Sequence, residues 1–203
     1  MTDQKFIWVL LAAGGSTRLG QAKQLLSLGQ TTLIHHQTCT LLATDLPVCV
    51  VSGAEELSPY LPQHKHLTLI HNSKWQAGLA TSIQLAQSHY PGHHIGWVLV
   101  DQYGITTKRA RAFYDYWQRR SCLALASQYD TEPKAWGVPV ITHKKLMATA
   151  DLAALGLKPW LQANQQAISL EFFSWPEAKL DLDTPEQWSK VKQQANWHKI
   201  TSV

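Results

Sequence analysis

The fold is decided by a stretch near the N-terminus that reads FIWVLLAAGGSTRLGQAK, residues 6–23. It opens with a continuous run of apolar, mostly β-forming residues at 6–12 and then turns to small residues, among them Gly14 and Gly15. A short uninterrupted apolar run is typical of a strand that is buried on both faces of a sheet. We therefore expect a central strand that leads directly into a glycine-rich loop.

Predicted strands and helices alternate along the rest of the chain. The further predicted strands, each a short run rich in apolar residues, are residues 47–52, 67–71, 95–100, 122–127 and 137–142. The predicted helices, each with apolar residues three and four positions apart, are residues 31–43, 78–88 and 106–119. Alternation of this kind buries both faces of a mostly parallel sheet through right-handed crossovers, so the predicted fold class is α/β.

A last helix is predicted near the C-terminus. Thr184 supplies the capping residue, Pro185 occupies the first helical position and Gln187 closes a capping box. No internal repeat or linker divides the sequence, so we expect a single domain over residues 1–203. The segment 130–173 is the least regular part of the chain, and we expect it to form a cap over the acceptor side of the site.

The composition excludes several classes of protein. The 18 Lys and Arg against 14 Asp and Glu give a formal charge of +4, but the basic residues are scattered, and no basic run marks a nucleic-acid-binding face. The longest uncharged apolar run, residues 6–13, is far shorter than the roughly 20 residues of a membrane-spanning helix. The three cysteines and the paired histidines lack disulfide or zinc-site spacing. We expect a cytoplasmic protein that binds neither nucleic acid nor membranes.

The glycine-rich loop has the composition of a phosphate-binding loop. Its small residues let main-chain N–H groups approach an anion closely, and Arg18 and Lys23 add the positive charge that a triphosphate requires. The spacing matches neither G-x-x-x-x-G-K-[ST] nor G-x-G-x-x-G, because Gly14 and Gly15 are adjacent and Lys23 stands three residues past Gly20. A P-loop ATPase and a Rossmann dehydrogenase are therefore both disfavoured.

Acidic residues at two places could hold a metal ion. Asp101 directly follows the strand predicted at 95–100, and ligands of open α/β sheets bind beyond the carboxyl ends of the strands. Asp181 and Asp183 alternate, which puts both carboxylates on the same side of an extended segment. Mg²⁺ prefers one or two carboxylates together with phosphate oxygens. Helix capping by Asp101 or Asp183 is the other interpretation, and the residues alone leave both open.

Four motifs keep a common order along nearly the whole chain. They are LAAGGSTRLGQAKQLL at 11–26, NSKWQAGLATSI at 72–83, Asp101-Gln102, and DLDTP at 181–185. Together they resemble the MobA-like nucleotidyltransferases, and most closely the branch that contains molybdenum-cofactor cytidylyltransferase. The resemblance implies a single-domain, Rossmann-like three-layer sandwich of the type found in nucleotide-diphospho-sugar transferases.

The resemblance also implies an activity, the Mg²⁺-dependent transfer of a nucleoside monophosphate from an NTP to a phosphorylated acceptor, with release of pyrophosphate. The implied catalytic residues are Arg18, Lys23 and Asp101, and the implied metal ligands are Asp101 and Asp183. The implied nucleotide-binding residues are Leu11, Ala12, Ala13, Gly14, Gly15, Ser16, Arg18, Lys23, Asn72, Gly78, Thr81 and Ser82. For Thr81 and Ser82, ordinary helix packing is an equally good interpretation. Enzymes that handle the molybdenum cofactor are the implied partners.

The nucleotide base and the acceptor are less closely defined. In this family a Leu-Ala-Ala-Gly sequence is typical of cytidylyltransferases, so Ala13 favours CTP, with ATP, GTP and UTP still open. Residues 101–104 read DQYG where Asp-Gln-Pro is usual, and residues 155–160 read LGLKPW where an acidic position and an arginine are usual. Residues 137–140, GVPV, do resemble the family's Gly-x-Pro element. The alternatives are a sugar-phosphate nucleotidyltransferase and a non-catalytic nucleotide- or cofactor-binding protein.

Overall fold

The computed structural model describes residues 5–16, 20–131, 135–149, 156–182, 184 and 186–189. The strands are β1 Phe6–Leu11, β2 Ser27–Leu28, β3 Thr31–Thr32, β4 Val48–Ser52, β5 Leu67–His71, β6 His94–Leu99, β7 Ala124–Gln128, β8 Trp136–Thr142 and β9 Leu170–Ser174. The α-helices are α1 Leu33–Leu42, α2 Leu79–His89, α3 Thr107–Gln118, α4 Lys144–Thr149 and α5 Leu157–Asn164. Short 3₁₀ turns are η1 Lys23–Leu25, η2 Ser58–Tyr60, η3 Trp75–Ala77 and η4 Pro176–Lys179.

A seven-stranded sheet in the order β5-β4-β1-β6-β8-β7-β9 forms the centre of the molecule. The first four strands of that order are mutually parallel, β8 runs antiparallel to both β6 and β7, and β9 pairs with β7 in parallel. The α/β class and the mostly parallel sheet predicted from the sequence are confirmed. No strand was predicted at β9, which extends the sheet at its far edge.

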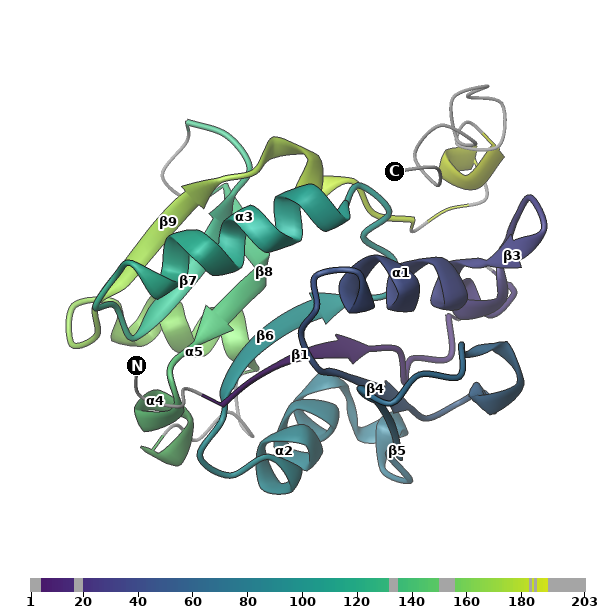
Figure 1. Cartoon of the computed structure of the whole chain (residues 1–203), viewed down its shortest axis with the longest axis horizontal. Coiled ribbons are helices and arrows are strands. Elements are labelled where there is room, and N and C mark those ends of the chain that lie inside the picture. Colours follow the sequence, from purple (N-terminus) through teal and green to yellow (C-terminus); the bar gives the residue numbers. More distant parts are fainter. Residues whose placement is uncertain are drawn as a thin grey trace.

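Both faces of the sheet are covered by helices, which makes a three-layer sandwich (Figure 1). Along β1 the side chains alternate, so that Phe6, Trp8 and Leu10 pack beneath α1 and α3, while the intervening residues pack against α2, α4 and α5. Trp8 is fully buried, and burial of a large side chain contributes roughly 1.5–3 kcal/mol. A strand with two apolar faces is therefore stable only in the middle of such a sheet.

Threonine side chains cap two of the helices that the sequence predicted. Thr106 Oγ1 accepts a hydrogen bond from the Arg109 N–H at 3.4 Å at the start of α3. Near the C-terminus the Gln187 amide oxygen accepts from the Thr184 N–H at 2.9 Å, and the Gln187 N–H donates to Thr184 Oγ1 at 3.3 Å. This reciprocal pair is the predicted capping box.

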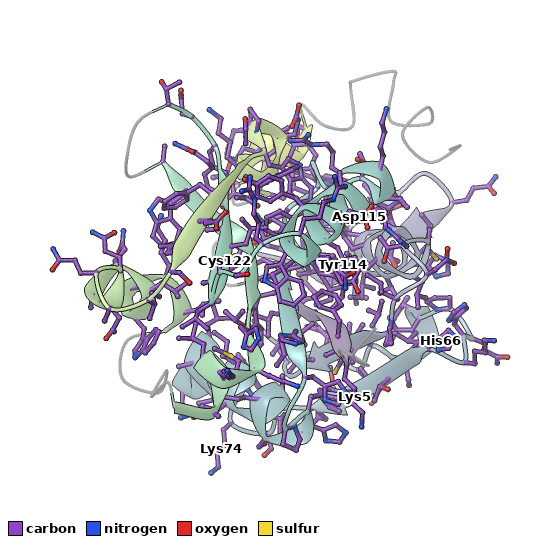
Figure 2. The ribbon with its side chains drawn as sticks, turned by 60° about the vertical axis from the view of Figure 1, so that its left-hand side comes forward. Lys5, His66, Lys74, Tyr114, Asp115 and Cys122 are labelled. Carbon is purple, nitrogen blue, oxygen red and sulfur yellow. The ribbon has the colours of Figure 1, made fainter. Side chains whose placement is uncertain are left out.

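The buried apolar side chains form two clusters, one on each face of the sheet, and none of the described Asp, Glu, Lys and Arg residues is fully buried. His66 and Lys74 are exposed at the edge of the molecule, whereas Tyr114 and Cys122 are buried (Figure 2). The three cysteines are free thiols. Within the described residues, no helix combines the length and apolarity needed to cross a bilayer.

The segment 130–173 contributes strands and helices rather than a separate unit. It includes β8, most of β9, α4 and α5, and both of its strands are hydrogen-bonded into the central sheet. That this segment caps the acceptor side of the site remains a prediction.

Candidate active site

The glycine-rich loop after β1 is folded back on itself by two polar side chains. The buried Gln24 amide donates to Ala12 O and to Gly14 O, each at 2.7 Å. Ser16 Oγ accepts from the Lys23 N–H at 2.9 Å. These bonds hold η1 against the loop and bring Lys23 to the end of β1. No role was predicted for Gln24 from the sequence, because a glutamine beside a lysine is indistinguishable from a surface residue until its burial is known.

Lys23 and Asp101 form an ion pair at the carboxyl edge of the sheet. Lys23 Nζ lies 2.9 Å from Asp101 Oδ2, and only 13% and 19% of the two side chains are exposed. Among the residues that the structure describes, the other carboxylate oxygen, Asp101 Oδ1, is buried without a hydrogen-bond partner. The structure thus brings together two of the three predicted catalytic residues, 78 positions apart in the chain. The third, Arg18, and the second predicted metal ligand, Asp183, lie outside the described residues.

The turn that carries Asp101 is fixed by its neighbour Gln102. The buried Gln102 amide donates to Val138 O at 2.6 Å and to Ala178 O at 2.7 Å, and its amide oxygen accepts from the Leu99 N–H at 3.2 Å. The Gln102 carbonyl in turn accepts from the Gln37 side chain at 2.6 Å. Gln102 therefore ties the Asp101 turn to α1, β8 and η4 at once.

The family's usual proline after this Asp-Gln pair is replaced here by Tyr103-Gly104. Gly104 packs so tightly against η4 that an added Cβ would overlap Glu177 O. The turn is therefore held by packing and by the Gln102 bonds, where a proline would restrain the backbone directly.

A cavity of about 380 Å³ opens between the loop, η3, α2 and the Asp101 turn. It is lined by most of the residues that the sequence predicted for nucleotide, phosphate or metal binding: Leu11, Ala12, Ala13, Gly14, Gly15, Ser16, Lys23, Gly78, Ser82 and Asp101. It is also lined by residues for which no role was predicted: Gln24, Trp75, Gln76, Leu79, Leu99 and Val100. Main-chain groups, one cation and one carboxylate thus share a space of nucleotide size.

Two predicted nucleotide contacts, Asn72 and Thr81, do not line this cavity in the described structure. The buried Asn72 amide donates to Thr81 Oγ1 and to Ser82 Oγ, both at 2.9 Å, and Asn72 Oδ1 accepts from the Lys74 N–H at 2.9 Å. Asn72 thereby joins the end of β5 to the first turn of α2. Of the pair whose role was left open, Ser82 lines the cavity, whereas the Thr81 hydroxyl donates to Gly78 O at 2.8 Å and to Lys74 O at 3.1 Å.

The loop lies unusually close to the segment that follows β4. A Cβ added at Gly53 would lie 2.7 Å from both Ala13 O and Trp75 Cβ, and one added at Gly15 would lie 3.0 Å from the Trp75 ring. The Ala54 N–H also donates to Ala13 O at 3.0 Å. Because Gly53 and Gly15 have no side chain, the Trp75 side chain can pack directly against the glycine-rich loop.

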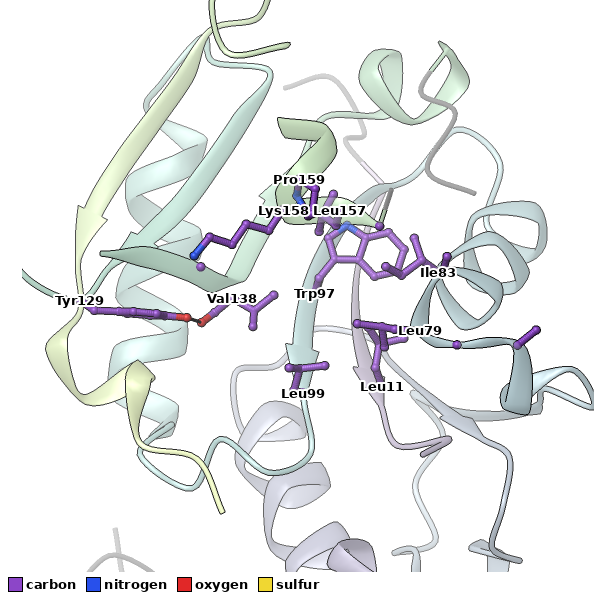
Figure 3. A pocket seen from close by; sticks show the side chains of 15 residues that line it. Leu11, Leu79, Ile83, Trp97, Leu99, Tyr129, Val138, Leu157, Lys158 and Pro159 are labelled. Carbon is purple, nitrogen blue, oxygen red and sulfur yellow. Dashed lines mark hydrogen bonds between the residues drawn. The ribbon is translucent and has the colours of Figure 1, made fainter. Parts of the chain in front are cut away.

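A second cavity, of about 530 Å³, adjoins the first. The two share four lining residues at their border: Leu11, Gly78, Leu79 and Leu99. The second cavity extends between α2, β8 and the start of α5 (Figure 3). Tyr129 lies in its wall and donates its hydroxyl to Val138 O. Burial, and then the nearby charge of Asp181, raise the pKa of Tyr129, so this hydroxyl stays protonated at neutral pH.

The residues at Asp101 fit a divalent cation. A buried carboxylate oxygen without a described partner is the kind of ligand that Mg²⁺ prefers. No group of three or more His, Cys, Asp or Glu side chains in the described part of the chain could hold an ion by itself. A cation bound by Asp101 would need further ligands, such as water or phosphate oxygens.

A profile of the MobA-like NTP transferase domain matches residues 8–168 of this chain. The chain belongs to this family. This chain is 25% identical over 193 residues to the molybdenum cofactor cytidylyltransferase of Escherichia coli (strain K12). The alignment covers 91% of this chain and 94% of the relative. The family and this relative identify the protein as a nucleotidyltransferase, as the motifs predicted.

Solved structures share the MobA-like fold. A homologue of Mycobacterium tuberculosis Rv0371c from Mycobacterium sp. strain JC1 superposes with a TM-score of 0.71 at 25% identity, over 92% of this chain and 94% of that one. Rv0371c of strain H37Rv in complex with manganese gives a TM-score of 0.69 at 19% identity, over 94% and 98% of the two chains. At 19% identity, the similarity to Rv0371c shows a shared fold and nothing more.

Proposed function

We propose that this enzyme transfers CMP from CTP to a phosphorylated small-molecule acceptor in a Mg²⁺-dependent reaction, with the molybdenum cofactor as the candidate acceptor. The name of the E. coli relative and the sequence Leu11-Ala12-Ala13-Gly14 support CTP and this acceptor. The same proposal places the enzyme in the cytoplasm, beside other enzymes of molybdenum-cofactor handling. Its three free cysteines fit a reducing compartment.

The observation that carries the proposal is the cavity in which the loop, Lys23 and Asp101 meet. Main-chain N–H groups and an ammonium stabilise phosphate oxygens. A carboxylate beside them repels an anion unless a cation lies between the carboxylate and the anion. The ion pair with Lys23 keeps Asp101 from repelling an incoming triphosphate. The pairing therefore supports a site for a nucleotide together with a divalent ion.

The roles of the residues follow from the chemistry of nucleotidyl transfer. An acceptor phosphate oxygen attacks the α-phosphorus in line, and the bond from that phosphorus to the bridging oxygen breaks with its electron pair, which leaves on pyrophosphate. The loop amides and Lys23, together with Arg18, would hold the β- and γ-phosphates, and Asp101 and Asp183 would hold Mg²⁺. Bound Mg²⁺ supplies neutralisation of negative charge on the phosphate oxygens. A phosphomonoester acceptor is already ionised at neutral pH, so no general base is required.

Nucleotide-dependent thermal stabilisation tests the base preference. A ligand that binds the folded state alone raises its apparent stability by an amount that grows with the logarithm of the ratio of ligand concentration to Kd. We expect CTP with Mg²⁺ to raise Tm more than GTP, ATP or UTP with Mg²⁺, and more than CTP with EDTA. A larger shift with GTP or ATP would contradict the assignment of CTP.

The alternative acceptor is a sugar phosphate, which the departure of residues 155–160 from the family pattern permits. A pyrophosphate-release assay with CTP, Mg²⁺ and a panel of phosphorylated acceptors distinguishes the two. No release above background with any acceptor of the panel would instead favour the non-catalytic binding protein.

A further inference from the structure

Most of the described side chains that line the cavity beside the nucleotide site are apolar. Its wall is made of side chains from β1, α2, β6, β8 and the start of α5, among them Leu11, Ile83, Trp97, Val138 and Leu157. These residues surround one space, with Leu79 and Leu99 at the border toward the nucleotide cavity (Figure 3). Its volume of about 530 Å³ lies within the range of small-molecule sites.

The polar groups in this wall are few, and two of them are engaged within the protein. The Trp97 N–H donates to Thr142 Oγ1 at 2.9 Å, and the Tyr129 hydroxyl donates to Val138 O. Of the described lining side chains, none carries a carboxylate or an amide. A ligand with many hydroxyls would leave most of them without partners here, and each unpaired buried hydroxyl costs roughly 1–3 kcal/mol.

Among the described lining residues, one carries a positive charge. Lys158, at the start of α5, lies in the wall, and its ammonium is 5.2 Å from the centre of the Trp136 ring. In Figure 3 the Lys158 side chain extends from α5 along β8, on the side of the cavity where Val138 and Tyr129 lie. An ammonium beside an apolar wall suits a ligand with an anionic group and a body that is not heavily hydroxylated.

We propose, resting on the function proposed above, that this cavity binds the body of the acceptor, and that the acceptor is a phosphate monoester whose body is a flat ring system rather than a polyhydroxylated sugar. The shared border places the acceptor next to the nucleotide. Its phosphate oxygen forms the new bond to the α-phosphorus while pyrophosphate leaves with the electron pair of the broken bond. Lys158 attracts the acceptor's charge, and the hydrocarbon wall selects against polyhydroxylated sugars.

The direct test is a binding titration of two phosphate monoesters against the enzyme with Mg²⁺ and the non-hydrolysable α,β-methylene analogue of CTP. We expect 1-naphthyl phosphate to bind at least about tenfold more tightly than glucose 1-phosphate, because its rings bury apolar surface. Glucose 1-phosphate binding equally well or better would overturn the proposal.

Two pairs of variants locate the site. Ala80 lines this cavity and not the first, so Ala80→Phe should weaken 1-naphthyl phosphate binding at least about tenfold and leave binding of the CTP analogue unchanged. Gln84→Phe, an equal ring on the exposed side of α2, is its control. Lys158→Gln should weaken the same ligand about three- to tenfold, whereas Lys108→Gln on the exposed surface of α3 should not.

The outcomes separate this proposal from the function on which it rests. Normal binding of the CTP analogue with no effect of Ala80→Phe on 1-naphthyl phosphate would overturn the acceptor cavity and leave the nucleotidyltransferase site standing. Loss of CTP-analogue binding in Ala80→Phe, with Gln84→Phe normal, would assign the cavity to the nucleotide base. Failure of the unaltered enzyme to bind the CTP analogue would remove both proposals.

Discussion

The two cavities at the carboxyl edge of the sheet differ in the charged groups that line them. The nucleotide cavity is lined by one continuous loop, an ammonium and a carboxylate, together with residues of η3, α2 and β6, whereas the described lining of the adjoining cavity consists mostly of apolar side chains from five separate elements, with Lys158 as its cation. An anion can be recognised by a short local segment, because consecutive amides point in one direction. An apolar body needs walls on several sides, which distant parts of the chain must supply.

The two halves of the sheet meet where β6 and β8 pair in antiparallel fashion. At the site end of this seam, Gln102 bonds to Val138 O, and at the far end His94 Nδ1 accepts from the Lys144 N–H at 3.2 Å. One buried polar residue at each end of this seam, Gln102 and His94, thus joins the two halves of the sheet. The following changes test the two halves and then the seam, in order of decreasing expected effect.

The largest effect is expected for Asp101→Ala. Removal of the proposed metal ligand should lower kcat by about 10³-fold or more and weaken CTP binding about tenfold or less, since ground-state binding is shared with the loop and Lys23. Steady-state kinetics and calorimetric titration measure the two quantities. Asp115→Ala, in an exposed pair with Arg111, is the control. Equal losses of turnover and binding would contradict the metal role.

Gln102→Leu should destabilise the seam without changing the charge of the site. The substitution leaves Ala178 O and the Leu99 N–H without their side-chain partner, while Val138 O keeps only the Tyr129 hydroxyl, and an unsatisfied buried group costs about 1–3 kcal/mol. We expect the free energy of unfolding to fall by about 3 kcal/mol in urea denaturation. Gln84→Leu, at an exposed position, should change it by less than about 0.5 kcal/mol. Similar values for the two variants would contradict the role of Gln102.

Gly53→Ala should disturb the nucleotide half through packing. The added Cβ would lie 2.7 Å from Ala13 O, an atom of the loop itself, so the free energy of unfolding should fall by about 1–3 kcal/mol. A loss of 1 kcal/mol lowers Tm by about 2–4 °C in a chain of this size. Gly14→Ala, where no atom lies within 4 Å of the added Cβ, should leave Tm unchanged and serves as the stability control. Equal Tm values would show that the loop can move away from β4.

The smallest effect is expected from pH at the far end of the seam. Burial first, and then the charges of His143, Lys144 and His93, lower the pKa of His94 from 6.5 to about 4. The unfolded chain takes up a proton below pH 6.5 and the folded protein does not, so stability should fall as the pH drops from about 6.5 toward 4. Between pH 7 and pH 5 we expect a loss of about 1–2 kcal/mol.

His94→Asn tests the origin of that loss, because its amide oxygen can still accept from the Lys144 N–H. The variant should flatten the pH dependence of the free energy of unfolding, whereas His66→Asn, at an exposed position, should keep it. An unchanged slope in His94→Asn would assign the pH dependence to another group.

The sequence predicted the strands of the parallel half well, because each is a continuous apolar run with a glycine-rich or polar boundary. It did not predict β9, Leu170–Ser174, a half-exposed edge strand whose register is set by β7, more than forty residues earlier. It also missed Gln24 and Gln102 as structural residues. A glutamine is polar in any sequence, and only the surrounding fold buries it and supplies its partners.

The sequence by itself determined the α/β class, the family and the residues of the phosphate loop, because these depend on local patterns of apolar, small and charged residues. Only the tertiary structure decided that Lys23 pairs with Asp101, that Gln102 holds the Asp101 turn, and that Lys158 stands over a hydrocarbon cavity. Each of these depends on residues far apart in the chain. Contacts of that kind are set by the packing of whole elements, which no local pattern specifies.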